Sequence, residues 1–277
     1  MIMVGKLYLV GTPIGNLEDI SFRALKVLKE VDIIAAEDTR HTRKLLNHFE
    51  IKTPLTSYYE HNKRAKGEYI ISLLLEGKQV ALVSDAGMPG ISDPGEDIVR
   101  DAVSAGVSVS VIPGPNAALA ALVISGLPSA RFIFEGFLPR EKKERKAILN
   151  KLCTEQRTMI FYEAPHRLTK TLEDLDKYFG DRRVAVVREI TKKFEEIIRG
   201  SLKELINYYT KNLPRGEFTL VVAGAPPAAV EVPDLNQLKE EVNRLIDAGM
   251  PKKEAIKEVA HRYHIPKRTV YDISLKE

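Results

Sequence analysis

The chain of 277 residues has few of the features that mark secreted, membrane or metal-binding proteins. Cys153 is its only cysteine, which excludes an intrachain disulfide and a zinc site built from cysteines. The longest apolar run, Ala117–Ile124, is too short to span a bilayer, and the first residues, MIMVGKLYLVG, lack the regions of a signal peptide. The six histidines lack metal-ligand spacing. We therefore expect a cytoplasmic protein with no membrane contact and no bound metal.

Two common nucleotide-binding signatures are also absent. The segment Gly11–Asn16, GTPIGN, follows a strand-like run but has neither the GK[ST] of a P-loop nor the GxGxxG of a dinucleotide fold. Glu37 and Asp38 end the next apolar run, where a dinucleotide fold places its ribose-binding acid. Without the glycines this match is weak, so the sequence disfavours NAD(P).

What the chain does contain is an alternation of strand-like and helix-like segments from Lys6 to about Ala223. Apolar, β-branched runs predict strands, and the segments between them have the apolar spacing of helices. This pattern predicts an α/β fold of layered sheets covered by helices. We expect one α/β domain over residues 1–114 and a second over 115–226, with a cleft between them. The predicted strands are 6–10, 31–36, 79–83, 107–112, 131–136, 158–163, 183–189, 194–200 and 218–224.

The C-terminal part has a different pattern. Ala223–Asp234 is rich in proline and alanine and predicts a linker. The residues after it contain no strand pattern, and residues 233–277 predict a small all-α domain that resembles a helix-turn-helix. We expect the buried faces of its three helices to consist of Leu235, Leu238, Val242, Leu245 and Ile246, then Ala255, Ile256, Val259 and Ala260, then Val270 and Ile273.

Positive charge is concentrated in this tail. Pro251–Tyr271 carries six lysines and arginines against two acidic residues, a surplus of four that equals the net charge of the chain. Basic second and third helices suit a phosphate backbone. A helical cap with a solvated charged face is the alternative. The candidate nucleic-acid contacts are Lys252, Lys253, Lys257, Lys267 and Arg268.

Loops rich in glycine and proline follow two consecutive strand-like runs. Ser84–Gly95 has five such residues among twelve, and Pro113–Ala117 reads PGPNA. Open α/β sheets bind ligands at the loops that leave the carboxyl ends of their strands, and glycine allows close approach of a ligand. Together with Gly11–Asn16, these loops predict a small-molecule pocket rather than ordinary strand-to-helix turns.

Two charged segments are further candidates. Arg40 and Arg43 lie three residues apart after the second strand, and they can grip an anion or pair with nearby acids. Glu163, His166 and Arg167 cluster directly after an apolar strand, either as a site or as a capped helix start.

Together these segments resemble the ribosomal RNA small-subunit methyltransferase I family, a branch of the tetrapyrrole methylase-like (class III) S-adenosylmethionine enzymes. The tail is similar to the small C-terminal helical domain of that family. The resemblance implies a two-domain tetrapyrrole methylase-like fold with the cofactor in the interdomain cleft. It also implies a homodimer. The segments that carry the resemblance are LVGTPIGN, AAEDTRHTRKLL, VSDAGMPGISDPG, VIPGPNA, FYEAPHR and GEFTLVVAG, within residues 6–224.

The implied reaction is methylation of the ribose 2′-hydroxyl of cytidine 1402 in 16S ribosomal RNA, with the small ribosomal subunit as partner. The cofactor is S-adenosylmethionine, and no metal is needed. Carried over by position, the implied cofactor contacts are Ile14, Asp85, Ala86, Gly87, Met88, Asn116, Ala117, Tyr162, Glu163 and Leu220.

A ribose hydroxyl is a poor nucleophile until its proton is removed, so a general base is expected. Asp38, Glu163 and His166 are the candidates. We prefer Asp38, because its loop is expected to face the cleft, and we expect Arg40 and Arg43 to hold RNA phosphate.

Two other functions stay open. A methyltransferase of a tetrapyrrole or another small molecule would share this fold, although such an enzyme needs no basic tail. A regulator that senses a ligand and binds DNA through its tail would bind duplex in the major groove.

Overall fold

The structure is a computed structural model that describes residues 4–227, 234–263 and 265–275. The chain divides into two compact units, Met1–Ala225 and Pro226–Glu277. Within the predicted linker Ala223–Asp234, residues 228–233 lie outside the described residues. The expected division of the first unit near residue 114 stays a proposal.

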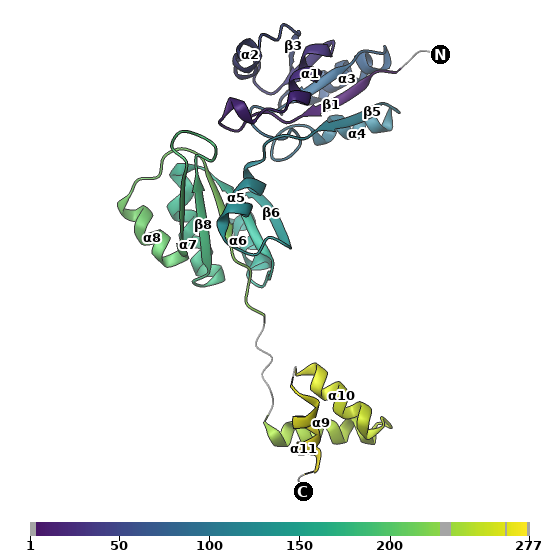
Figure 1. Ribbon diagram of the computed structural model, residues 1–277, viewed down its shortest axis with the longest axis vertical. Coiled ribbons are helices and arrows are strands. Elements are labelled where there is room, and N and C mark those ends of the chain that lie inside the picture. The colour runs from purple at the N-terminus through teal and green to yellow at the C-terminus, as the bar shows by residue number, and fades with distance from the viewer. Residues whose placement is uncertain (1–3, 228–233, 264, 276–277) are drawn as a thin grey trace. The chain divides into compact units, whose positions relative to one another are not determined.

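The first sheet of the larger unit is wholly parallel, with the strand order β3-β2-β4-β1-β5. Figure 1 labels β1, β3 and β5 of this sheet. Its strands are β1 (Lys6–Val10), β2 (Ile33–Ala36), β3 (Leu55–Ser57), β4 (Val80–Val83) and β5 (Ser108–Ile112). Four of the five were predicted. Strand β3 was not predicted, because three residues directly after a proline are too few to show a strand period.

Helices cover both faces of this sheet, which explains why its central strand β4 is buried at every position. Side chains of α1 and α2 share one core cluster with the sheet, and side chains of α3 and α4 share another. The helices are α1 (Phe22–Glu30), α2 (Thr39–His48), α3 (Lys63–Leu75) and α4 (Glu96–Ser104).

The second sheet is mixed, with the order β6-β7-β10-β8-β9. Only β6 and β7 pair in parallel, and the other neighbours are antiparallel. All five strands match predicted segments. They are β6 (Phe132–Phe137), β7 (Thr158–Glu163), β8 (Arg183–Arg188), β9 (Glu196–Ser201) and β10 (Phe218–Val222).

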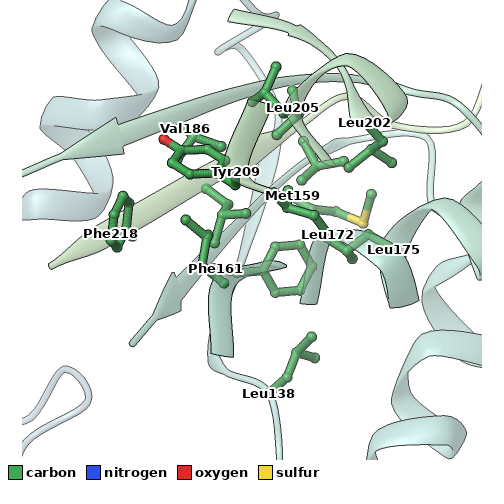
Figure 2. Packing of buried hydrophobic residues seen from close by; sticks show 14 of the residues in the cluster. Leu138, Met159, Phe161, Leu172, Leu175, Val186, Leu202, Leu205, Tyr209 and Phe218 are labelled. Atoms are coloured by element: carbon green, nitrogen blue, oxygen red, sulfur yellow. The ribbon is translucent and has the colours of Figure 1, made fainter. Parts of the chain in front are cut away.

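The second sheet has a large core on one face and a smaller one on the other. Figure 2 shows the large core, to which the sheet contributes Phe161 and Phe218 and the helices contribute Leu172 and Leu205. The helices on this face are α6 (Lys142–Leu152), α7 (Leu168–Phe179) and α8 (Leu202–Lys211). On the other face α5 (Ala117–Ser125) packs against Ile160, Val187 and Val221. The predicted cap Ser201 begins α8 and forms a capping box with Glu204.

The smaller unit contains the three predicted helices, α9 (Leu235–Asp247), α10 (Lys252–Arg262) and α11 (Lys267–Leu275). They share one apolar core that includes the predicted Val242, Val259 and Val270. The prediction for Leu235 is wrong, because this first residue of α9 is 60% exposed. Its spacing places it on the apolar face, but it lies one turn before Leu238, the first residue of α9 in the core.

Gly67→Ala is expected to stabilise the larger unit by about 0.5–1 kcal/mol, because glycine inside a helix costs conformational entropy. Gly67 lies within α3, and a β-carbon there would meet only Ile98 Cδ1 at 3.8 Å and Tyr58 Cε2 at 3.9 Å, ordinary contact distances. Urea unfolding followed by circular dichroism measures the change. A lower midpoint would contradict the packing around α3.

Candidate active site

A cavity of about 350 Å³ lies where loops from the first sheet meet strand ends of the second sheet. Eight of the ten implied cofactor residues line it, namely Ile14, Ala86, Gly87, Met88, Asn116, Ala117, Tyr162 and Glu163. The other lining residues are Ile91, Ser92, Asp93, Phe137, Ala164, Pro165, Val187, Ile190, Glu217, Phe218 and Thr219. The loops that the glycine and proline pattern singled out therefore do meet at one cavity.

The loops after β1 and β5 are held together by direct contact of their backbones. A β-carbon on Gly114 would lie 2.8 Å from the α-carbon of Gly11, and one on Gly11 would lie 2.7 Å from the α-carbon of Gly114. Only glycine fits at either position, because real β-carbons do not approach so closely.

The loop after β4 is joined to the same place by hydrogen bonds. The Thr12 N–H donates to the Gly87 carbonyl at 2.9 Å, and the Gly87 N–H donates back to the Thr12 carbonyl at 3.1 Å. The buried Thr12 hydroxyl also donates to the Ser84 carbonyl at 3.2 Å. Gly87 has a φ of +84°, in the left-handed region that favours glycine. The first wall of the cavity is therefore set by backbone geometry.

The second wall is aromatic and apolar. The Tyr162 ring lies edge-on to Phe134 at 5.0 Å between centroids and tilted against Phe137 at 5.6 Å. Its hydroxyl accepts a hydrogen bond from the Ala118 N–H at 3.2 Å, near the start of α5. Asn116 caps that helix by accepting from the Leu119 N–H at 3.0 Å. Apolar walls with a few fixed polar groups are typical of small-molecule sites.

The charge of the lining has one sign. Asp93, Glu163 and Glu217 line the cavity, and no lysine, arginine or histidine is among the residues that do. Glu163 and Glu217 are each paired with a basic side chain outside the lining, Arg167 at 3.4 Å and Lys192 at 2.8 Å, whereas Asp93 has no basic partner among the described residues. The lining therefore favours a ligand with positive charge over the phosphates of a dinucleotide chiefly through Asp93. This agrees with the weak NAD(P) signature of the sequence.

Glu163 is buried and fully engaged. One of its carboxylate oxygens accepts from the Ala164 N–H at 2.9 Å and lies 3.4 Å from the Arg167 Nε. The other oxygen accepts from the Thr171 hydroxyl at 2.5 Å. Because both oxygens are held, Glu163 is better placed to fix the end of β7 than to take up a proton.

Asp38 and Arg40 bind each other at the surface. Asp38 begins α2 by accepting from the Arg40 N–H at 2.8 Å, and its other oxygen lies 3.0 Å from Arg40 Nη2. The Arg40 hydrogen bonds lower the pKa of Asp38 to about 2. Asp38 does not line the cavity, so the geometry disfavours it as a general base. Arg43 is exposed on the same helix, with no acidic partner among the described residues.

Three further predicted residues lie away from the cavity. Asp85 lines a neighbouring depression with His41 and Lys44, where it accepts from the Asp38 N–H at 3.0 Å. His166 lines a basic depression with Arg145 and Lys170. The structure therefore brings only Glu163, of the three candidate bases, to the cavity.

Leu220 is the third predicted residue that lies away from the cavity. It belongs to the large core, on the face of the second sheet opposite to α5. Successive side chains of a strand point to opposite faces, so the preceding residue, Thr219, lines the cavity instead. Both faces of this sheet are covered and every residue of β10 is buried. The apolar pattern of the β10 sequence therefore does not indicate which of its residues face the cavity.

Asp93 is a cavity residue that the sequence analysis did not single out. Burial raises its pKa to about 6, and the nearby Asp85 carboxylate adds to the effect, against a hydrogen bond from Ser84. Burial likewise raises the pKa of Glu37 to about 7, with contributions from Asp93 and Asp85. The preceding Ser92 has a φ of +67°, an uncommon conformation for a residue other than glycine. The available signal was that Asp93 is the second aspartate of the segment SDAGMPGISDPG.

Among the described residues, no three histidine, cysteine, aspartate or glutamate side chains are grouped as a metal site requires. No helix in the described part of the chain has both the length and the apolar character needed to cross a bilayer.

Comparison with known proteins gives a family match and close relatives. The model of the tetrapyrrole (corrin/porphyrin) methylases matches residues 6–206. Ribosomal RNA small subunit methyltransferase I of Bacillus subtilis (strain 168) is 52% identical over 273 residues, covering 97% of this chain and 94% of the relative. The protein of the same name from Halalkalibacterium halodurans is 50% identical and covers 99% and 96%.

Solved structures of lower identity share the fold. A uroporphyrin-III-C-methyltransferase from Thermus thermophilus has a TM-score of 0.58 at 24% identity, covering 79% of this chain and 94% of that one. A structure of that enzyme type complexed with S-adenosyl homocysteine has a TM-score of 0.57 at 18% identity, covering 78% and 97%. These likenesses confirm the expected tetrapyrrole methylase-like fold.

Gly114→Ala is expected to destabilise the larger unit by about 1–3 kcal/mol, because the added methyl group would force the two loop backbones apart. Urea unfolding measures the loss, and Gly67→Ala serves as the matched control, since it adds the same group where space exists. An unchanged midpoint for Gly114→Ala would show that the two loops do not touch.

Proposed function

Because the chain belongs to the tetrapyrrole (corrin/porphyrin) methylases, and within them to the ribosomal RNA small subunit methyltransferase I family, we propose that it methylates the ribose 2′-hydroxyl of cytidine 1402 in 16S ribosomal RNA. The chain is a methyltransferase. The proposed methyl donor is S-adenosylmethionine. We place the reaction in the cytoplasm, on RNA of the small ribosomal subunit, and expect the enzyme to act as a homodimer.

The observation that carries the proposal is a cavity built by the predicted loops and lined by acidic but no basic side chains. S-adenosylmethionine has a positive sulfonium and a positive ammonium group, so this lining suits it. The apolar wall with Ile14, Tyr162 and Val187 suits its adenine ring. When bound, this cofactor would supply an electrophilic methyl group on its sulfonium sulfur.

The chain's own residues would position the reactants and hold a proton. Methyl transfer is an in-line displacement, and positioning alone contributes up to roughly 7–11 kcal/mol in favourable cases. The rigid Gly11–Gly114 contact and the Tyr162 hydrogen bond to α5 fix the two walls that would do so.

We propose Asp93 as the general base, in place of Asp38. Asp93 lines the cavity, and its pKa of about 6 leaves it ionised at neutral pH while still able to take up a proton. Its carboxylate would receive the proton of the ribose hydroxyl as the oxygen bonds to the methyl carbon and the bond from that carbon to the donor's sulfur breaks. Glu163 would act through positioning, since its oxygens already accept hydrogen bonds.

RNA binding would rest on cations outside the cavity. The five basic residues predicted in the tail, Lys252, Lys253, Lys257, Lys267 and Arg268, line a single groove of the helical unit. Arg43 is exposed for phosphate contact, whereas Arg40 would have to leave Asp38 first. His166 joins this set in the basic depression with Arg145 and Lys170 rather than in catalysis.

A methyltransferase of a tetrapyrrole is the second candidate, favoured by the fold shared with a uroporphyrin-III-C-methyltransferase. Radiolabelled S-adenosylmethionine and small ribosomal subunits that lack the modification separate the two. We expect label on a single cytidine ribose of 16S RNA, mapped by nuclease digestion. Absence of label on the RNA, with the cofactor bound, would favour the small-molecule reaction.

Asp93→Asn is expected to lower the rate of methyl transfer by about 100-fold or more, as removal of a general base does. Because the base acts when deprotonated, the single-turnover rate of the wild type should rise as pH increases through about 6, and the variant should lose this rise. Asp38→Asn is the matched comparison and should retain both the wild-type rate of methyl transfer and its rise with pH. A variant of Asp93 with the wild-type rate and pH profile would rule it out.

A further inference from the structure

The groove of the helical unit lies between α10 and α11, has a volume of about 610 Å³ and is cationic. Five lysine and arginine side chains line it together with Ile256 and Tyr271, and no acidic residue is among the lining residues. Within the described part of the chain, none of the five is paired with a carboxylate. Lys252 Nζ has only a distant contact, 3.5 Å, with the Ser274 carbonyl.

Two acidic side chains of this unit, Glu241 and Glu258, are paired with arginines outside the groove. Glu241 binds Arg262, lies 3.8 Å from Arg244, and accepts a hydrogen bond from the Tyr263 hydroxyl. Glu258 lies 3.3 Å from Arg262. Ion pairs therefore neutralise the arginines outside the groove and leave the groove itself positive. Net positive charge that is gathered on one concave surface is the electrostatic footprint of a polyanion site.

Tyr271 distinguishes this surface from a purely electrostatic one. Its neighbours Val270 and Ile273 are buried in the core of the unit, whereas Tyr271 itself is 50% exposed and lines the groove. The hydroxyl of Tyr263 has a carboxylate partner, but the Tyr271 hydroxyl has none among the described residues. An exposed ring among cations offers a surface on which a base can stack between phosphate contacts.

We propose that this groove binds an unpaired segment of RNA, with a base stacked on the Tyr271 ring and the adjoining phosphates on the five cations. A duplex hides the faces of its bases, so it would use the cations and leave the ring unused. The inference rests on the proposed function, in that RNA is the substrate, and adds which form of RNA the tail recognises.

The absence of tryptophan from the chain allows a direct test. Full-length Tyr271→Trp has a single tryptophan, at position 271. Its indole ring can stack on bases just as a tyrosine ring can. We expect its fluorescence to change saturably with an unstructured cytidine-rich RNA oligonucleotide and to change little with an RNA duplex of equal charge. Tyr69→Trp is the matched control, because Tyr69 is 44% exposed beside Lys66 but lies in the larger unit. Equal responses of both variants, or no response at position 271, would overturn the proposal.

Affinity measurements separate stacking from charge. Tyr271→Ala should weaken binding of the single-stranded oligonucleotide roughly 5- to 150-fold, with the slope of log affinity against log salt unchanged because no charge is lost. Tyr271→Phe should restore the affinity. Lys257→Ala should instead reduce that slope by about 0.7. A Tyr271→Ala variant with wild-type affinity, or a Tyr271→Phe variant as weak as alanine, would contradict stacking on the ring.

Failure of this inference is distinguishable from failure of the proposed function. Methyl transfer to ribosomal RNA with a silent Trp at position 271 would reject the groove and leave the enzyme's function intact. A saturable response at that position without methyl transfer to RNA would reject the proposed reaction and support the groove.

Discussion

The close contact between the backbones of Gly11 and Gly114 is the constraint on which the candidate site depends. Strands β1 and β5 are parallel neighbours, so their carboxyl ends lie at the same edge of the sheet, and β4 ends on the other side of β1. Three loops must therefore share one place. Glycine removes the side chains that would separate the loops after β1 and β5, and the Thr12–Gly87 hydrogen bonds attach the loop after β4. The loops can then meet the ends of the second sheet around a single cavity.

The distribution of charge separates two tasks. Carboxylates lie in and beside the cavity, where burial and mutual repulsion raise the pKa values of Asp93 and Glu37. Unpaired cations gather in the groove of the helical unit. The proposed methyl donor is cationic and the proposed substrate is a polyanion, so the two would require opposite surroundings, and the carboxylates and the unpaired cations lie on different parts of the chain. Asp38 and Arg40, which the sequence suggested as a general base and a phosphate contact, instead form an ion pair with each other.

Much of this could be predicted from sequence, because apolar runs and glycine-rich turns report on local structure. The loops were expected to meet at one pocket, since the carboxyl ends of parallel strands lie at the same edge of a sheet, and Ile14, Met88 and Asn116 of these loops do line one cavity. Their contact with a cofactor, which the family resemblance implies, stays a prediction. Features that depend on contacts between distant segments were not predictable. Which side chains of β10 face the cavity, Thr219 rather than Leu220, depends on how the strand pairs within a sheet that is covered on both faces. The unusual pKa of Asp93 follows from burial, which its own segment does not reveal.

We propose that the cavity between the glycine-rich loops and the ends of the second sheet holds S-adenosylmethionine. A crystal structure with the product S-adenosylhomocysteine tests it most directly. We expect density for the ligand against Ile14, Met88 and Tyr162, with its amino group toward the carboxylates of the lining. Ligand density at any other place on the chain, with this cavity empty, would contradict it.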